Sequence, residues 1–237
     1  MTGVPVAADE TGQKTRRIML VDDHPIVRRG LRRLIEGEAD LEVCGEAASV
    51  REARQAIREG APDAVVADIS LRDGDGIELV TDLHAHHPEL PVLVLSMHDE
   101  TIYAERLLAA GARGYIMKQA AGAEFLVALR SVLGGGVWVS DTVRSRILAR
   151  CAADDRSGPG DPIDRLSNRE LQVLGMIGRG LSSRQMADAL SLSVKTVESH
   201  RQRIKSKLGL STSAQLVRFA SVWVAGRAPP AAGSGPP

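Results

Sequence analysis

Short apolar runs alternate with amphipathic stretches from residue 17 to residue 134, and this alternation constrains the fold most strongly. Each run is short and almost wholly apolar, as the buried strands of a parallel sheet are. The stretches between the runs have the apolar spacing of helices. Five such units predict an α/β fold, a doubly wound five-stranded parallel sheet with helices on both faces. The predicted strands are residues 17–21, 41–45, 64–67, 91–95 and 114–117.

Four of these strands are followed by side chains that can take part in chemistry. Asp22 and Asp23 follow the first strand, and Asp68 follows the third. Ser96 and Lys118 follow the fourth and fifth. Because reactive groups of open α/β sheets gather at the carboxyl ends of the strands, we expect these side chains to converge.

The three carboxylates would repel one another, so at neutral pH the cluster needs a cation or a proton. Mg²⁺ suits it, because this ion prefers hard oxygen ligands and usually keeps several waters. A metal beside Asp68 would stabilise an in-line phosphoryl transfer, and Lys118 would supply a second positive charge. The Ser96 hydroxyl could donate to an attached phosphoryl group. The set therefore predicts a phosphorylation site at Asp68.

This set resembles the receiver domain of bacterial two-component response regulators, which has a flavodoxin-like fold, over residues 17–134. The resemblance is carried by Val21-Asp22-Asp23-His24-Pro25, by Asp68 with Asp75-Gly76 seven residues later, by Ser96 and by Lys118. It implies that Asp68 takes a phosphoryl group from a sensor histidine kinase. It also implies that the ligands of Mg²⁺ are Asp22, Asp23, Asp68 and the Ser70 carbonyl.

Two further positions bear on the resemblance. Tyr115, three residues before Lys118, matches the aromatic switch position of receivers. Arg72 stands where many receivers have proline, which affects the shape of the loop and not its chemistry. Asp75 is expected to cap the next helix. The histidines at the end of that helix, where imidazoles favour the dipole, are not expected to bind metal: His84, His86 and His87.

The formal net charge of +0 conceals two halves of opposite sign. Residues 17–150 contain 16 basic and 21 acidic side chains, whereas residues 161–237 contain 11 basic and 5 acidic ones. An acidic half joined to a basic half predicts two domains, of which the second can meet a polyanion.

Several features point to the cytoplasm, and the resemblance implies that it is a bacterial one. Cys44 and Cys151 lie far apart in the sequence and predict no disulfide framework. No apolar stretch approaches the roughly 18 residues of a membrane span. Residues 1–16 lack the apolar core of a secretion signal and are expected to form a disordered tail. A second such tail is expected at residues 227–237, which are rich in Pro and Gly.

Residues 135–162 are interpreted as a linker containing a short helix at 142–152. Trp138 and Val139, at its start, are expected to pack on the first domain. Residues 154–162 have no apolar run and are expected to form a flexible hinge, at which we place the domain boundary.

Residues 163–226 show four short helical patterns, a small all-α domain. Ser167 with Glu170 and Ser182 with Gln185 have the spacing of capping boxes. In the third pattern, capped by Ser193, one face is apolar and consists of Val194, Val197, Ile204 and Leu208. The opposite face carries Lys195, Ser199, Gln202 and Ser206. A helix with an apolar back and a front of amides, hydroxyls and cations suits the major groove of DNA, so the domain is predicted to be a helix-turn-helix.

The stretches Leu166–Leu174 and Ser193–His200 resemble the LuxR-type DNA-binding domain. A receiver followed by this domain is the arrangement of the NarL/FixJ family, in which the third helix enters the major groove and the fourth forms a dimer contact. Carried over, the candidate base contacts are Lys195, Glu198, Ser199 and Gln202, and the candidate phosphate contacts are Thr196, Arg203, Lys205 and Lys207.

The leading hypothesis is a transcription regulator rather than an enzyme, switched by phosphorylation and binding double-stranded DNA as a homodimer. One alternative is a phosphatase or phosphotransferase with an aspartyl-phosphate intermediate. Such enzymes commonly carry a second acid two residues after the nucleophile, where this chain has Ser70. The other alternative is a DNA-binding protein that does not depend on phosphorylation, against which the intact acid cluster argues.

Overall fold

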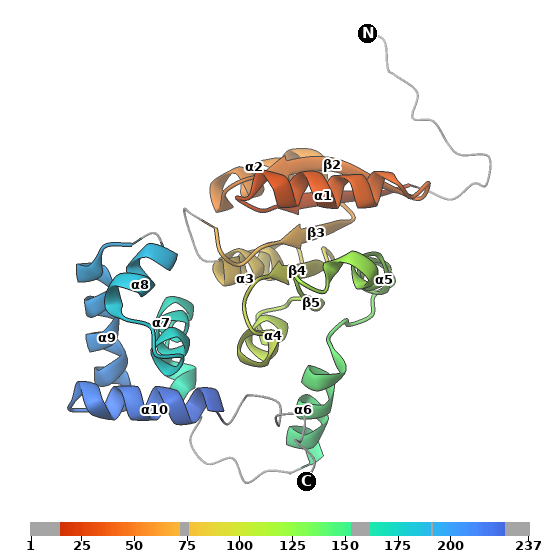
Figure 1. Ribbon diagram of the computed structural model, residues 1–237. Coiled ribbons are helices and arrows are strands. Elements are labelled where there is room, and N and C mark those ends of the chain that lie inside the picture. The colour runs from red at the N-terminus through yellow and green to blue at the C-terminus, as the bar shows by residue number, and fades with distance from the viewer. Residues whose placement is uncertain (1–14, 72–75, 153–161, 191, 226–237) are drawn as a thin grey trace, which may run out of the picture. The chain divides into compact units, whose positions relative to one another are not determined.

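The structure is a computed structural model that describes residues 15–71, 76–152, 162–190 and 192–225 (Figure 1). By its contacts the chain divides into two compact units, residues 1–153 and residues 154–237. Some of the predicted features lie outside the described residues. These are Arg72, Asp75, most of the hinge and most of the two tails.

The first unit is built on the predicted parallel sheet, with strand order β2-β1-β3-β4-β5. Every strand pair in it is parallel. The five-stranded doubly wound fold is therefore confirmed. β1 begins at Arg16, one residue inside the predicted tail, and β2 extends two residues beyond its predicted end. The strands are β1 (Arg16–Val21), β2 (Leu41–Ala47), β3 (Ala64–Ala67), β4 (Val92–Ser96) and β5 (Gly114–Met117).

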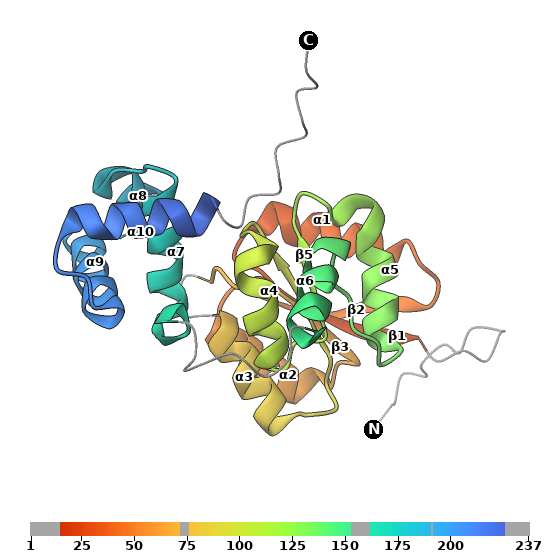
Figure 2. The same cartoon turned by 90° about the horizontal axis from the view of Figure 1, so that it is seen from below.

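Helices cover both faces of this sheet (Figures 1 and 2). One face shares a single apolar core with the helices α1 (Pro25–Glu36) and α5 (Ala121–Leu133), which contribute Ile35 and Phe125 among others. The opposite face is covered by α2 (Val50–Gly60), α3 (Gly76–His86) and α4 (Glu100–Ala109). This double coverage explains why the strands are apolar throughout rather than alternating.

The helix starts agree with local signals, with one change of partner. Ser49 caps α2 by accepting a hydrogen bond from the Glu52 amide. The two residues have the spacing of a capping box, but the Glu52 carboxylate accepts from the amide of Ala48 instead of Ser49, so the reciprocal half of the box is displaced by one residue. Asp99 caps α4 through the amide and hydroxyl of Thr101.

The segment after α5 belongs to the first unit. The Tyr115 amide donates to the Trp138 carbonyl at 2.9 Å, and the Trp138 amide donates to the Arg113 carbonyl at 2.9 Å. These bonds extend the ladder beyond the edge strand β5, and Trp138 and Val139 pack on the first unit. The helix expected at residues 142–152 is α6 (Asp141–Ala152), and it packs against α4.

The described residues of the second unit form a one-turn helix η1 (Pro162–Arg165) and the four predicted helices. Both predicted capping boxes are present, at Ser167 and at Ser182. Gly178 allows two helices to approach closely, because a Cβ there would lie 2.4 Å from the Ala220 carbonyl oxygen. The helices are α7 (Asn168–Gly178), α8 (Ser183–Ala189), α9 (Val194–Leu208) and α10 (Ser213–Ala225). Among the described helices of both units, none is long and apolar enough for a membrane span.

Candidate functional site

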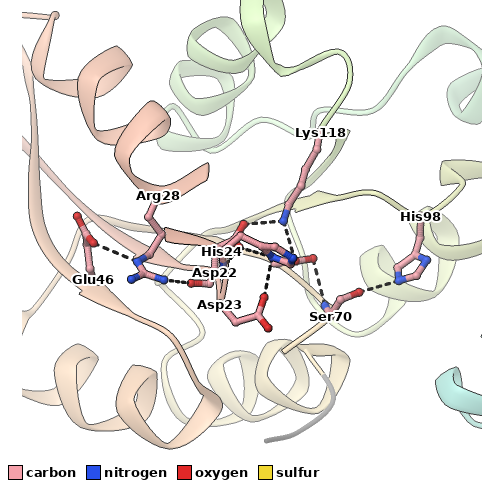
Figure 3. Close-up of polar contacts among 9 residues, drawn as sticks. Asp22, Asp23, His24, Arg28, Glu46, Ser70, His98 and Lys118 are labelled. Atoms are coloured by element: carbon pink, nitrogen blue, oxygen red, sulfur yellow. Dashed lines mark hydrogen bonds and ion pairs between the residues drawn. The ribbon is translucent and has the colours of Figure 1, made fainter. Parts of the chain in front are cut away.

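The Lys118 ammonium contacts two of the predicted strand-end carboxylates, those of Asp22 and Asp68 (Figure 3). Its Nζ lies 2.6 Å from Asp22 Oδ2 and 2.7 Å from Asp68 Oδ2. All three side chains are less than one tenth exposed. Backbone hydrogen bonds between neighbouring strands hold the site in place, because the Asp68 amide donates to the Val21 carbonyl and the Lys118 amide to the Ser96 carbonyl.

Burial and charge compete at this cluster. Burial raises the pKa of Asp68, and the nearby Lys118 ammonium opposes that shift without cancelling it. Burial by itself would lower the pKa of Lys118, but the carboxylates of Asp68 and Asp22 together raise it. Lys118 therefore stays charged, and the buried carboxylates compete for a single cation.

The donor set beside Lys118 fits a hard divalent cation. Asp22, Asp23, His24 and Asp68 each offer a ligand atom, and these atoms lie within 4.8 Å of one another. The three carboxylates supply oxygen atoms close together, and Mg²⁺ prefers oxygen ligands. The Ser70 amide donates to Asp68 Oδ1 at 3.1 Å, which places the backbone of Ser70 beside the same carboxylate.

His24 belongs to this cluster, although the sequence interpretation did not include it. Its Nδ1 lies 3.1 Å from Asp22 Oδ1 and 2.7 Å from Asp23 Oδ1. Its position directly after two acids was the available signal. On the other side, the Arg28 guanidinium donates to the Asp22 carbonyl and pairs with Glu46 at 3.1 Å (Figure 3). Arg28 thus ties the loop after β1 to β2.

His98 connects the residues predicted to respond to phosphorylation, and no pattern in the sequence indicated it. Its ring Nε2 shares a 2.7 Å hydrogen bond with Ser70 Oγ (Figure 3). Its amide donates to the buried Ser96 Oγ at 3.1 Å, and its carbonyl accepts from the Tyr115 hydroxyl at 2.7 Å. Tyr115 is buried, and burial raises the pKa of its hydroxyl.

Gly76 has a steric role beside Asp68. A Cβ at this position would lie 2.3 Å from Ile69 Cα and 2.7 Å from the Asp68 carbonyl oxygen. Only glycine lets α3 begin so close to the strand end that carries Asp68. The Asp75-Gly76 pair in the sequence therefore contributes geometry as well as a motif.

In the second unit, α9 buries an apolar face and exposes a polar one, largely as predicted. Val197 and Ile204 are fully buried and Leu208 is half-buried. Val194, on the same apolar face at the first residue of the helix, is 45% exposed. Burial lowers the pKa of the half-buried His200.

The predicted DNA-contacting side chains fall into two groups. Lys195, Ser199, Gln202 and Arg203 are exposed, and within the described part of the chain their side chains make no hydrogen bond or ion pair. The half-buried Lys205 likewise makes none there. The remaining three have intramolecular partners: Thr196 bonds the Ser193 hydroxyl, Glu198 accepts from Ser183, and Lys207 pairs with Glu170.

Lys207 of α9 forms an ion pair with Glu170 of α7. Lys207 Nζ lies 2.6 Å from Glu170 Oε2, and the Glu170 side chain is 3% exposed. The same carboxylate oxygen accepts the Ser167 amide at 2.7 Å as part of the capping box of α7. Burial would raise the pKa of Glu170, but Lys207 and Ser167 lower it overall. Lys207 therefore fastens the end of α9 to the start of α7.

Comparison with known proteins agrees with both units. The response regulator receiver domain matches residues 18–130, and the luxR family of bacterial regulatory proteins matches residues 164–220. The oxygen regulatory protein NreC of Staphylococcus aureus strain MRSA252 is 34% identical over 208 residues, covering 86% of this chain and 96% of its own. The chain belongs to the NarL/FixJ family of response regulators. As a NarL/FixJ protein it is a DNA-binding two-component response regulator.

Solved structures of other response regulators resemble this NarL/FixJ regulator over most of its length. RcsB of Salmonella enterica serovar Typhimurium, bound to promoter rprA in the presence of the phosphomimetic BeF3-, is 26% identical with a TM-score of 0.57. The match covers 88% of this chain and 99% of RcsB. A LuxR-family two-component response regulator of Aurantimonas sp. SI85-9A1 is 38% identical with a TM-score of 0.55, covering 59% of this chain and 99% of its own.

Proposed function

We propose that Asp68 is the phosphoacceptor of this regulator and that a sensor histidine kinase is its donor. The observation that carries the proposal is the placement of Lys118 between the buried carboxylates of Asp22 and Asp68. A cation held there, at the carboxyl end of the sheet, can move from a carboxylate to the oxygens of an incoming phosphoryl group. In this transfer an Asp68 oxygen forms the new bond to phosphorus while the bond from phosphorus to the donor imidazole breaks.

Mg²⁺ would be held by Asp22, Asp23, Asp68 and the Ser70 carbonyl, and it would neutralise charge on the transferring group. The Ser96 hydroxyl, fully buried beside His98, would donate to a phosphoryl oxygen. The receiver thus catalyses only its own phosphorylation and dephosphorylation. Family membership favours this role over turnover of a separate substrate, and Ser70 bonds His98 instead of supplying the second acid of a phosphatase.

Replacing the phosphoacceptor tests the assignment. Asp68→Asn should abolish Mg²⁺-dependent labelling by acetyl phosphate, measured as the added phosphoryl mass on the intact chain. Asp141→Asn is the matched control, because Asp141 is 94% exposed and lies on α6. Labelling of the Asp68→Asn variant at another residue, located by peptide mapping, would overturn the assignment.

We further propose that α9 enters the major groove of double-stranded DNA and that the active form is a cytoplasmic homodimer. The four exposed polar residues of α9 named above support the first part, because groups without an intramolecular partner are available to bases and phosphates. α10 supports the second, because Val217 and Val222 are exposed large apolar side chains on it. A dimer would place two copies of α9 on two half-sites.

Binding assays on a randomised DNA library separate base contacts from phosphate contacts. Gln202→Ala should relax base preference at one position of each half-site, by about 1–3 kcal/mol. Arg218→Ala is the matched control, because Arg218 is exposed on α10 and should leave base preference unchanged. An unchanged base preference in Gln202→Ala would remove Gln202 from the contacting set.

A further inference from the structure

An open cavity of about 760 Å³ lies at the edge of the receiver sheet opposite Asp68. Its lining includes the places where four neighbouring strands begin: Arg16 at β1, Asp63 before β3, Pro91 before β4 and Arg113 before β5. Parallel strands all begin at one edge of a sheet and end at the other, and Asp68 follows the end of β3. The cavity is therefore separate from the cluster around Lys118.

The buried part of the cavity lining is apolar. Ile57 near the end of α2 is 4% exposed, and Val132 near the end of α5 is 0% exposed. Leu90 and Leu133, also in the lining, are half-buried. Sites for small molecules have volumes of roughly 300–1,000 Å³ and are mostly apolar with a few polar groups. This cavity has the size and the apolar wall for the body of a small molecule.

Three exposed arginines, each from a different element, line the same cavity: Arg16, Arg58 and Arg113. Arg16 pairs with Asp63 at 3.5 Å, and Asp63 also accepts the Arg17 amide at 2.8 Å. The side chains of Arg58 and Arg113 make no hydrogen bond or ion pair with the part of the chain that the structure describes. Two guanidinium groups therefore remain available to a ligand.

The charge of the lining differs in sign from the charge of the receiver. Residues 17–150 contain 21 acidic and 16 basic side chains, whereas the lining has three arginines and two carboxylates, Asp63 and Glu89. Of its two histidines, His86 pairs with Asp82 at 3.2 Å, and His87 is exposed. A concave surface lined by an excess of one charge concentrates ligands of the opposite charge.

The backbone at the rim of the cavity is strained at Ala61. Its φ of 40° is the one positive value among the non-glycine residues that the structure describes. L-residues rarely adopt this left-handed conformation, and strained residues gather at ligand sites. Here the strained turn joins α2, which carries Arg58, to Pro62 and Asp63 of the same lining.

We propose that this cavity binds a small amphipathic anion, an apolar body that carries one carboxylate, sulfonate or phosphate group. The apolar body would pack on Ile57, Leu90 and Val132. The anionic group would accept charge-assisted hydrogen bonds from Arg58 and Arg113, because planar guanidinium groups match the geometry of such oxyanions. The proposal does not depend on the role assigned to Asp68.

A pair of dyes tests the site on the full-length protein. The probe is 8-anilinonaphthalene-1-sulfonate, whose sulfonate stands in for the anionic group, and its uncharged counterpart is N-phenyl-1-naphthylamine. Fluorescence titration gives the affinity for each dye. Amide NMR shifts locate the bound probe, and the largest shifts are expected in residues 57–63 and 87–91, which border the cavity.

Arg58→Met and Arg113→Met should each weaken binding of the sulfonate about tenfold, as expected when one charge-assisted hydrogen bond is lost. Binding of the uncharged dye should be unchanged in both variants. Arg33→Met is the matched control, because Arg33 is an exposed arginine of α1 outside the lining and its loss changes the net charge equally. Because the replaced side chains are exposed, the variants should stay folded.

Three results would overturn the proposal. Shifts confined to other surfaces, such as the exposed Val217 and Val222 of α10, would mean that the probe does not bind in the cavity. Equal affinity of Arg113→Met and Arg33→Met for the sulfonate would remove the guanidinium contact. Equally tight binding of the two dyes to the wild type would exclude an anion as the preferred class of ligand.

Discussion

In the receiver, Asp22, Asp68 and Lys118 are buried and serve as partners for one another, whereas Lys195, Gln202 and Arg203 of α9 are exposed. The difference follows from what each region must do. In a buried cluster the effective dielectric constant is low, so one added phosphoryl group strongly changes the electrostatic interaction energies between its members. Such sensitivity suits a switch. A surface for a polyanion gains from cations that stay free, because each one can displace a counterion from a phosphate.

The second unit also contains a counterexample, the pair of the buried Glu170 with the exposed Lys207. There a charge of α9 has an intramolecular partner, as in the receiver, although it lies on the helix proposed to enter the major groove. Burial of the partner carboxylate, rather than membership of a basic helix, decides which role a lysine has.

The largest effect is expected when the receiver cluster loses its cation. Lys118→Met removes the cation that the buried carboxylates of Asp22 and Asp68 share, which should lower the free energy of unfolding of the first unit by about 3–5 kcal/mol. Urea unfolding followed by Trp138 fluorescence, in a Trp223→Phe background, measures it. A loss under about 1 kcal/mol would mean that the cluster behaves like an exposed surface pair. Arg144→Met provides the exposed-pair control.

A smaller effect is expected from backbone packing in the second unit. Gly178→Ala places a methyl group 2.4 Å from the Ala220 carbonyl oxygen and should destabilise this unit by about 2 kcal/mol. Gly175→Ala, on the same helix, meets its nearest neighbour at 3.7 Å and should be neutral or stabilising by up to about 1 kcal/mol. Trp223 fluorescence in a Trp138→Phe background reports on this unit. Equal effects of the two substitutions would contradict the close approach of α7 and α10.

Lys207→Met tests whether the pair of Lys207 with the buried Glu170 behaves like the receiver cluster. Removing Lys207 should destabilise the second unit by about 2 kcal/mol at neutral pH. Because the folded-state pKa of Glu170 is lowered, this contribution is complete above the unfolded pKa and is lost as the pH falls through the folded one. The stability difference between the wild type and the variant should therefore shrink below about pH 4.

The same variant separates the internal role of Lys207 from the phosphate contact predicted by the sequence. If the lysine acts only within the domain, the salt dependence of DNA binding at fixed folded fraction should be unchanged. If the slope of log affinity against log salt becomes shallower by about 1 in this variant, Lys207 contacts a phosphate after all.

The smallest effect on the protein itself is expected at the exposed cation Arg203. Arg203→Ala should leave unfolding within about 0.5 kcal/mol of the wild type, as surface substitutions usually do. The logarithm of its DNA affinity should fall less steeply with log salt, by about 1 unit of slope, with base preference retained. A changed base preference would move Arg203 to the base contacts.

Local patterns predicted most of the fold because they repeat at short range. The apolar runs identified all five strands, and the capping boxes at Ser167 and Ser182 identified the starts of α7 and α8. The pattern was less useful for residues whose partners lie far along the chain. Val194 has the spacing of a buried residue but lies outside the core, and α6 has the composition of a linker helix but packs on α4.

The sequence by itself determined the fold class, the convergence of Asp22, Asp68, Ser96 and Lys118, and the polar face of α9. The positions of these groups at the ends of apolar runs and on one side of a helix follow from short-range periodicity. Only the tertiary structure decided which groups are paired: Lys118 with both carboxylates, His98 with Ser70 and Tyr115, Lys207 with Glu170, and Arg146 with α4. The physical reason is that burial sets the strength of a charge or hydrogen bond, and burial depends on elements that are remote in the chain.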